Sequence, residues 1–117
     1  MPLNNAAMIV AANALRSAIT HMQSHNGDPG VAGTSNLTTA ARQAITWGSA
    51  TNDGDFDLSS PITFSGITPN GAVTYVSLWG ALNGGTWYGN FALAGDLTAN
   101  SSGLFSVYSL PQNGSAT

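Results

Sequence analysis

The sequence has 117 residues, of which only 6% are charged, against roughly 25% in typical proteins. The two cations are Arg16 and Arg42, there is no Lys, Glu or Cys, and the net charge is −3. Nucleic-acid binding is therefore not expected, because several Lys or Arg contacts would have to supply it. Disulfides and thiolate metal sites are excluded. The length suits one domain with a single core.

A surface with so few charges has little electrostatic repulsion to keep copies apart. It suits a subunit that is packed against its neighbours, although drift in genome composition would give the same bias. No basic stretch precedes the first apolar residues, and the longest apolar run, residues 6–12, is too short to cross a bilayer. We therefore expect no membrane contact.

The first part of the chain is predicted to form a helix over residues 5–19, which Asn4 or Asn5 can cap. Three larger apolar residues recur at helical spacing and form one stripe: Met8, Leu15 and Ile19. The small side chains of Ala11 and Ala18 would let another backbone approach closely. We expect this segment, residues 1–20, to pack on its own sheet, and packing against copies of itself is the alternative.

After the turn signals at residues 26–30 and a small, polar loop at 30–39, the pattern becomes that of short strands. The predicted strands cover residues 43–48, 61–67, 72–79, 86–90, 91–97 and 104–110. Such spacing predicts a mainly β fold, an antiparallel β-sandwich (jelly-roll-like or Ig-like) over residues 20–110, with one short N-terminal α-helix. Residues 111–117 are predicted to be a flexible tail.

Residues suited to catalysis are scarce. There are two His and no Cys, Lys or Glu, and no Gly-x-Ser-x-Gly turn is present. We therefore expect a protein that is not an enzyme and uses no cofactor. His21 and His25 are four residues apart, but no third metal ligand is evident, so we expect hydrogen-bonded, structural histidines.

An acidic stretch contains Asp53, Asp55 and Asp57, which resembles the start of a calcium loop. The pattern fails in its second half, because Leu58 and Phe64 stand where an EF-hand needs Gly and Glu. We expect a solvated turn with no metal required for folding. A weak Ca²⁺ contact shared with a neighbouring subunit is the alternative.

Trp87 and Tyr88 are adjacent, so in a strand their rings point to opposite faces, and one of them would face a partner. Stacking of the exposed ring on a sugar is the alternative. Trp47 and Trp79 are assigned structural roles in the β domain. We expect Arg42 to form a charge-assisted bond with Asp28.

The order of several short blocks resembles a family of small minor-tail or tail-fibre-like proteins from tailed phages of actinobacteria. The blocks are HNGDPG at 25–30, ARQAITWG at 41–48, VSLW at 76–79 and GGTWYG at 84–89. The block at 41–48 is the specific part, and the resemblance covers most of residues 4–90. Ser24 stands where the family has Leu, and residues 50–60 and those after Gly89 follow no family pattern.

This resemblance implies a non-enzymatic structural protein of the virion, assembled in the bacterial host cytoplasm. Its partners would be copies of itself and other virion proteins. Two other interpretations remain open: a decoration protein on the capsid lattice, and a carbohydrate-binding module that contacts a glycan of the host surface.

Overall fold

The computed structural model describes residues 4–51 and 54–112. Its helix, α1, runs from Asn5 to Ala18, within one residue of the predicted span. Asn4 is the cap: its side-chain oxygen accepts a hydrogen bond from the backbone N–H of Ala7 at 2.9 Å, as expected for a residue at this position. The helix ends where Ile19 turns to an extended conformation.

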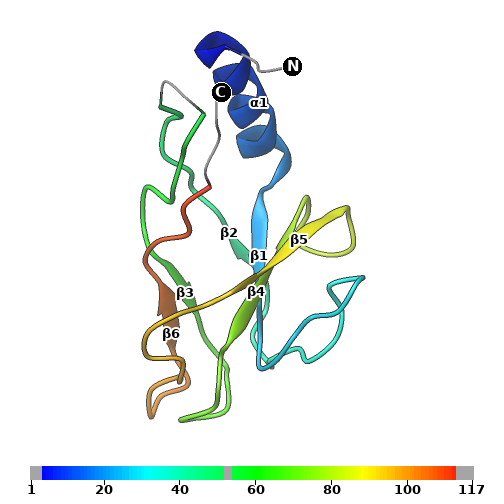
Figure 1. The fold of residues 1–117 in the computed structure, drawn as a ribbon. Coiled ribbons are helices and arrows are strands. Elements are labelled where there is room, and N and C mark those ends of the chain that lie inside the picture. Colours follow the sequence, from blue (N-terminus) through cyan, green and yellow to red (C-terminus); the bar gives the residue numbers. More distant parts are fainter. Residues whose placement is uncertain (1–3, 52–53, 113–117) are drawn as a thin grey trace.

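The body consists of two antiparallel sheets, one with strand order β2-β1-β4-β5 and one formed by β3 and β6. The strands are β1 (His21–His25), β2 (Gln43–Ala44), β3 (Ile62–Phe64), β4 (Tyr75–Trp79), β5 (Trp87–Ala92) and β6 (Phe105–Val107). The two sheets face each other as in a sandwich (Figure 1). The predicted mainly β, antiparallel fold with one short helix is confirmed.

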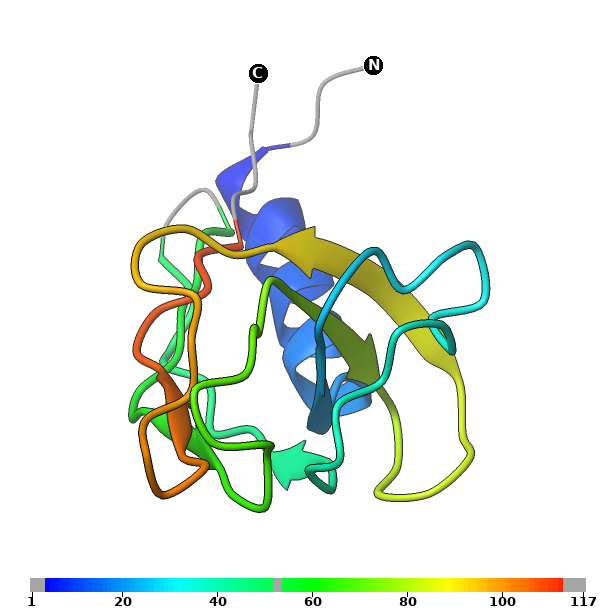
Figure 2. The ribbon, with the colours of Figure 1, turned by 90° about the horizontal axis from the view of Figure 1, so that it is seen from below.

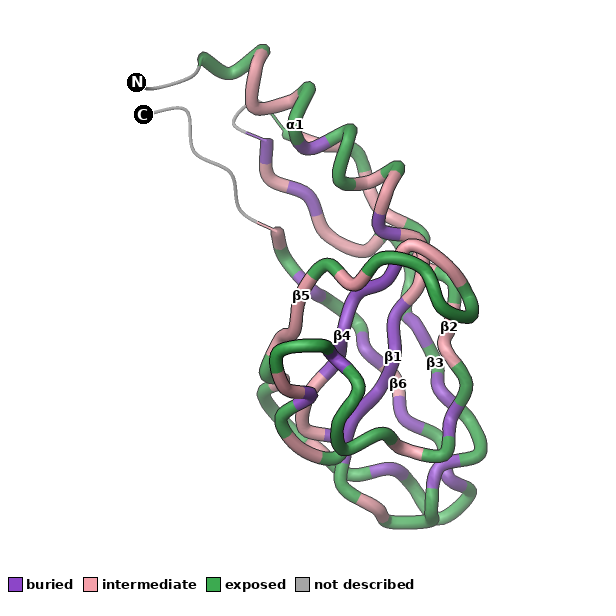
Figure 3. The backbone as a smooth tube through the Cα atoms, turned by 90° about the vertical axis from the view of Figure 1, so that its right-hand side faces the viewer, coloured by how far each residue is buried: buried purple, intermediate pink, exposed green. Residues whose placement is uncertain are grey.

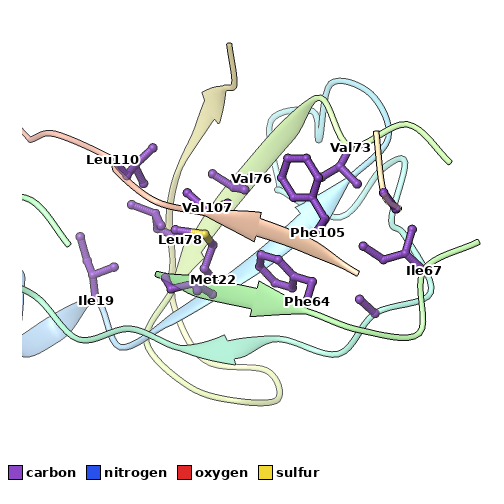
Figure 4. Packing of buried hydrophobic residues seen from close by; sticks show 13 residues of the cluster. Ile19, Met22, Phe64, Ile67, Val73, Val76, Leu78, Phe105, Val107 and Leu110 are labelled. Atoms are coloured by element: carbon purple, nitrogen blue, oxygen red, sulfur yellow. The ribbon is translucent and has the colours of Figure 1, made fainter. Parts of the chain in front are cut away.

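The hydrophobic core lies between the sheets. Met22, Val76 and Leu78 of the larger sheet point toward residues of the smaller sheet (Figure 4). Those opposing residues are Phe64, Phe105 and Val107. Burial of side chains of this size stabilises a fold by roughly 1.5–3 kcal/mol each, so this layer holds the two sheets together.

β1 was not predicted as a strand, yet it lies inside the larger sheet, between β2 and β4. Gln23 and His25 are polar and buried on its outer side. Ser24 lies on the same side as Met22, since their partners Val76 and Leu78 are both core residues. The core side of HMQSH therefore has only one apolar residue, and no apolar period marks the strand.

α1 extends from one end of the body, and most of its surface is exposed or half-buried (Figure 3). Ala12 is its one buried residue, and Val10 and Leu15 are 69% and 45% exposed. The helix contacts the segment around Gly54, where an added Cβ would lie 2.7 Å from the carbonyl oxygen of Met8. The expectation that the helix packs on a sheet face is therefore wrong, because α1 packs on a loop.

The last described residues are held in place. Gln112 was predicted to belong to a flexible tail, but its N–H and C=O exchange hydrogen bonds with Phe56 at 2.7 and 2.9 Å. The rest of that predicted tail, residues 113–117, lies outside the described residues. The closing segment is therefore tied to the same loop that supports α1.

Candidate functional site

The outer face of the larger sheet carries a buried row of polar side chains on β1 and β4. His25 Nε2 lies 2.6 Å from Ser77 Oγ, and Trp79 Nε1 donates to the same oxygen at 2.7 Å. His25 Nδ1 lies 2.9 Å from the carbonyl oxygen of Ser35. These contacts fasten the loop of residues 26–41 over the sheet.

The partners of His25 determine its tautomer. A carbonyl oxygen only accepts, so Nδ1 carries the proton and donates to Ser35, and the Ser77 hydroxyl donates to Nε2. Burial lowers the pKa of His25, hydrogen bonding to Ser35 opposes this, and the Arg42 charge lowers it further. The ring is therefore favoured in its neutral form.

A serine hydroxyl on a histidine nitrogen is also the geometry of an activated nucleophile. Here Ser77 and His25 are both 0% exposed, and the other histidine nitrogen is bound to a backbone carbonyl instead of a carboxylate. A substrate cannot reach Ser77 Oγ in this arrangement. The geometry supports the prediction of structural, hydrogen-bonded histidines.

The predicted partner of Arg42 is wrong. Its guanidinium lies 3.9 Å above the ring of Trp79 and donates from Nη1 to the carbonyl oxygens of Ala81 and Gly84, at 2.9 and 2.7 Å. Asp28 instead accepts a hydrogen bond from the N–H of Gly30 at 2.9 Å. Arg42 thus links the start of β2 to the turn between β4 and β5, through a cation–π contact and carbonyl groups.

The structure separates the two rings of the predicted contact pair. Trp87 is half-buried against Gly33, where an added Cβ would lie only 2.5 Å from the indole. Its Nε1 donates to Asn90 Oδ1, and Asn90 Nδ2 donates to the carbonyl oxygen of Gly30. The loop carrying Gly30 and Gly33 therefore lies beside β5 (Figure 2), and Tyr88, 44% exposed, is the ring that faces outward.

The small-residue candidates on α1 lie at different depths. Ala11 is exposed, whereas Ala18 is half-buried and its carbonyl oxygen lies close to Gly80. Trp47 supports the end of the helix by donating from Nε1 to the carbonyl oxygen of Ile19 at 2.9 Å. Its ring meets Phe56 edge to face, with centroids 5.0 Å apart. Among these residues, Ala11 is the accessible one.

The acidic stretch does not form one solvated turn. Asp57 accepts hydrogen bonds from the backbone N–H groups of Leu58 and Leu110 at 2.7 and 2.6 Å, and from the hydroxyl of Ser109. Burial raises the pKa of Asp57, but these hydrogen bonds outweigh it and hold the pKa below its usual value. Asp57 therefore binds the C-terminal segment at Ser109 and Leu110. This corrects the expectation that its side chain is solvated.

Asp55 is half-buried and Asp53 lies outside the described residues. Within residues 4–51 and 54–112, no group of three or more His, Cys, Asp or Glu side chains is placed to hold a metal ion. In the same part of the chain, no helix combines the length and apolarity needed to cross a membrane.

The surface is poor in charge and rich in apolar side chains. Of the charged residues that the structure describes, only Asp28 and Asp96 are exposed. Eight large apolar residues are exposed: Val10, Leu15, Val31, Leu37, Leu82, Tyr88, Leu104 and Tyr108. Tyr108 and Leu104, which flank β6, are not among the contact residues that the sequence predicts. The alternation of residues 104–108 carried the signal, since Phe105 and Val107 face the core and their neighbours face outward.

Comparison with known proteins gives one assignment. A family model described as "Podophage GP4 fiber I protein gp80" matches residues 4–110. A search of curated proteins returned no match. The match extends beyond the region of the sequence resemblance and supports a phage fibre family, without the restriction to phages of actinobacteria. Because the model spans nearly the whole chain, this protein belongs to the podophage GP4 fiber I protein gp80 family.

Proposed function

We propose that this protein is a structural, non-catalytic subunit of a phage fibre or minor tail assembly that binds its neighbours through uncharged surfaces. Membership of a phage fibre family supports a tail-fibre-like structural role in the virion. The proposal further includes that the protein is assembled in the host cytoplasm and that it contacts copies of itself and other virion proteins.

The observation that carries the proposal is that the surface exposes many large apolar side chains and few charged ones. Eight large apolar side chains are exposed, whereas only two of the described charged residues are. Single exposed apolar residues are common on any protein, but charged groups normally accompany them and keep copies apart. A surface with so few charged groups is suited to being covered.

Two regions are the proposed contacts. The first is α1, where the exposed Ala11 and Leu15 border a groove of about 160 Å³ toward Gly54 and Phe56, and Val10, 69% exposed, lies on another side of the helix. The second is Tyr88, on the solvent side of the pair formed with Trp87. A 14-residue helix of this kind is only marginally stable alone in water, so a partner against its free side would stabilise it.

A salt wash of intact particles tests this proposal. Charge-based contacts weaken as the Debye length falls from ~10 Å at 0.1 M salt to ~3 Å at 1 M. Apolar and hydrogen-bonded contacts are screened far less. We therefore expect the protein to stay on the virion in 1 M NaCl, as quantified by mass spectrometry, and release between 0.1 and 1 M would contradict the proposal.

Variants of Tyr88 locate the contact. Tyr88→Ala should lower the number of copies per virion while the isolated domain stays folded, because a ring facing a partner contributes to binding more than to the core. Tyr88→Phe keeps the ring and is the matched control, so it should retain occupancy. If both variants load normally, Tyr88 is not a contact residue.

The alternatives concern position and ligand. A capsid decoration protein would occur in hundreds of copies at lattice positions, so counting copies in an intact particle separates it from a fibre or tail subunit. A carbohydrate-binding role is favoured by one observation, the exposed rings of Tyr88 and Tyr108, which could stack on a sugar. Binding of host-surface polysaccharide that is lost in both Tyr→Ala variants would support that role.

A further inference from the structure

The smaller sheet has only two strands, and one edge of β6 has no strand partner among the described residues. β6 pairs with β3 from Phe105↔Phe64 to Val107↔Ile62. A two-stranded sheet is at best marginally stable by itself, and here the core supports one face of it. The free edge of β6 is the place where this sheet can be extended.

There is room beside that edge. A groove of about 520 Å³ separates β6 and the residues after it from residues 92–96, at the end of β5. Its lining contains one charged residue, Asp96, and is otherwise apolar or small. Free edges are usually protected by Lys, by Pro within the strand or by a covering loop. β6 has no charged residue or Pro, and residues 92–96 border the groove without pairing with β6 as a strand.

The side chains that flank β6 are apolar and exposed. Phe105 and Val107 point into the core, which leaves Leu104, Ser106 and Tyr108 on the other side of the strand. Leu104 is 40% exposed and Tyr108 is 74% exposed. An apolar residue therefore lies two positions from Ser106 on either side, and this arrangement is symmetric about Ser106.

We propose that β6 pairs edge to edge with β6 of a second copy of this chain, antiparallel, around a two-fold axis near Ser106. Antiparallel pairing of one segment with itself is two-fold symmetric, so the same surface serves both subunits. With the axis at Ser106, Leu104 of one copy lies opposite the partner's Tyr108. Each exposed apolar side chain then covers the other, and the smaller sheet becomes continuous across both copies.

Nothing in this segment opposes the pairing electrostatically. Residues 61–67 and 103–111 contain no charged side chain, and like charges placed opposite each other would be destabilising. The inference rests on the proposed role as an assembling structural subunit, and it adds the surface, the partner and the register.

The absence of Cys from the chain allows the register to be tested directly, because any introduced Cys is the only one present. Ser106→Cys should form a disulfide-linked dimer under mild oxidation. Opposed residues of an antiparallel pair lie about 4.5–5.5 Å apart at their Cα atoms, within the range that a disulfide spans.

A mixture of Leu104→Cys and Tyr108→Cys, one of them carrying a tag that changes its mass, should give mainly the mixed disulfide. Each variant alone should give little, because like positions would be four residues out of register, about 14 Å along the strand. Absence of the Ser106→Cys dimer overturns the proposal. Disulfides between like positions that form as readily as the mixed one overturn the register and hence the proposal.

Sedimentation velocity of the uncrosslinked full chain provides the second measurement. The unmodified protein should form dimers, and Tyr108→Lys should raise the dissociation constant about tenfold, since symmetry places the substitution in the interface twice. Val31→Lys, at a position 94% exposed in another loop, is the charge-matched control and should leave the dimer intact. Circular dichroism checks that both variants are folded.

The outcomes separate this inference from the proposed function. A dimer unaffected by Tyr108→Lys, or a monomeric unmodified protein, overturns the β6 pairing. Neither result alters the salt-wash prediction, which concerns retention on the virion through α1 and Tyr88. Loss of polysaccharide binding in Tyr108→Ala with no effect on association would also overturn the pairing and favour a sugar at this ring.

Discussion

Removal of one hydroxyl group should test whether the buried polar row on β1 and β4 stabilises the fold. Ser77→Ala takes away the acceptor of the Trp79 Nε1–H, at 2.7 Å, and the donor to His25 Nε2, at 2.6 Å. Ser77 and His25 are fully buried and Trp79 is nearly so, which leaves water little access to replace the lost oxygen.

The expected magnitude follows from counting the two groups left without a partner. Each buried, unsatisfied polar group costs about 1–3 kcal/mol, so Ser77→Ala should lower the free energy of unfolding by about 2–6 kcal/mol. This is a large share of the 5–15 kcal/mol that is typical of a whole domain. By comparison, the exposed Ser65→Ala should change the stability by no more than about 0.5 kcal/mol.

Urea unfolding at pH 7.5, followed by tryptophan fluorescence, measures both variants. A double-mutant cycle with Trp79→Phe isolates the bond between the indole and the hydroxyl. If the cycle is additive, or if Ser77→Ala lowers the free energy of unfolding by less than about 1 kcal/mol, the buried polar row on β1 and β4 does not stabilise the fold as its geometry indicates.

His25 has a lowered pKa in the folded protein, so the unfolded chain binds its proton first. The stability should be full above the unfolded pKa of about 6.5 and should fall as the pH drops toward the folded pKa; equal urea midpoints at pH 7.5 and 5.5 would contradict this. Asp57→Asn should lower the free energy of unfolding by about 1–3 kcal/mol, because a charged acceptor of three hydrogen bonds is replaced. The same variant should speed hydrogen exchange at the amide of Leu110, and unchanged exchange there would refute the role of Asp57. Arg42→Met should lower the stability by about 1–2 kcal/mol through loss of the ring and carbonyl contacts, and an unchanged urea midpoint would show these contacts to be unimportant. EDTA and added Ca²⁺ should give the same melting temperature, whereas a large rise with Ca²⁺ would reveal a metal site near Asp55, since selective binding to the native state stabilises it.

The helix and most strands could be predicted because each has an apolar period on one side. Asn4 and the spacing of Met8 and Ile19 specify α1 locally, and the alternation around β6 marks which residues face the core. These features depend on neighbouring residues only. They can therefore be inferred without knowing the tertiary structure.

The missed features depend on contacts between distant segments. β1 is polar on its outer face because the loop of residues 26–41 covers it, as the bonds of Gln23 to Ala40 and of His25 to Ser35 show. Arg42 contacts carbonyl groups of a turn about forty residues away, whereas charge alone suggested a carboxylate. Neither the covering loop nor the free carbonyl groups leave a pattern in the local sequence.

The placement of α1 has a mechanical consequence. Fourteen residues at a rise of 1.5 Å give a rod about 21 Å long, close to half of the 46 Å longest dimension of the molecule. A rotation of about 10° at the base of this rod would displace its far end by about 4 Å, comparable to the spacing between neighbouring strands. The hydrogen bond from Trp47 to Ile19 acts at that base. It therefore restricts the angle at which α1 projects from the body of the molecule.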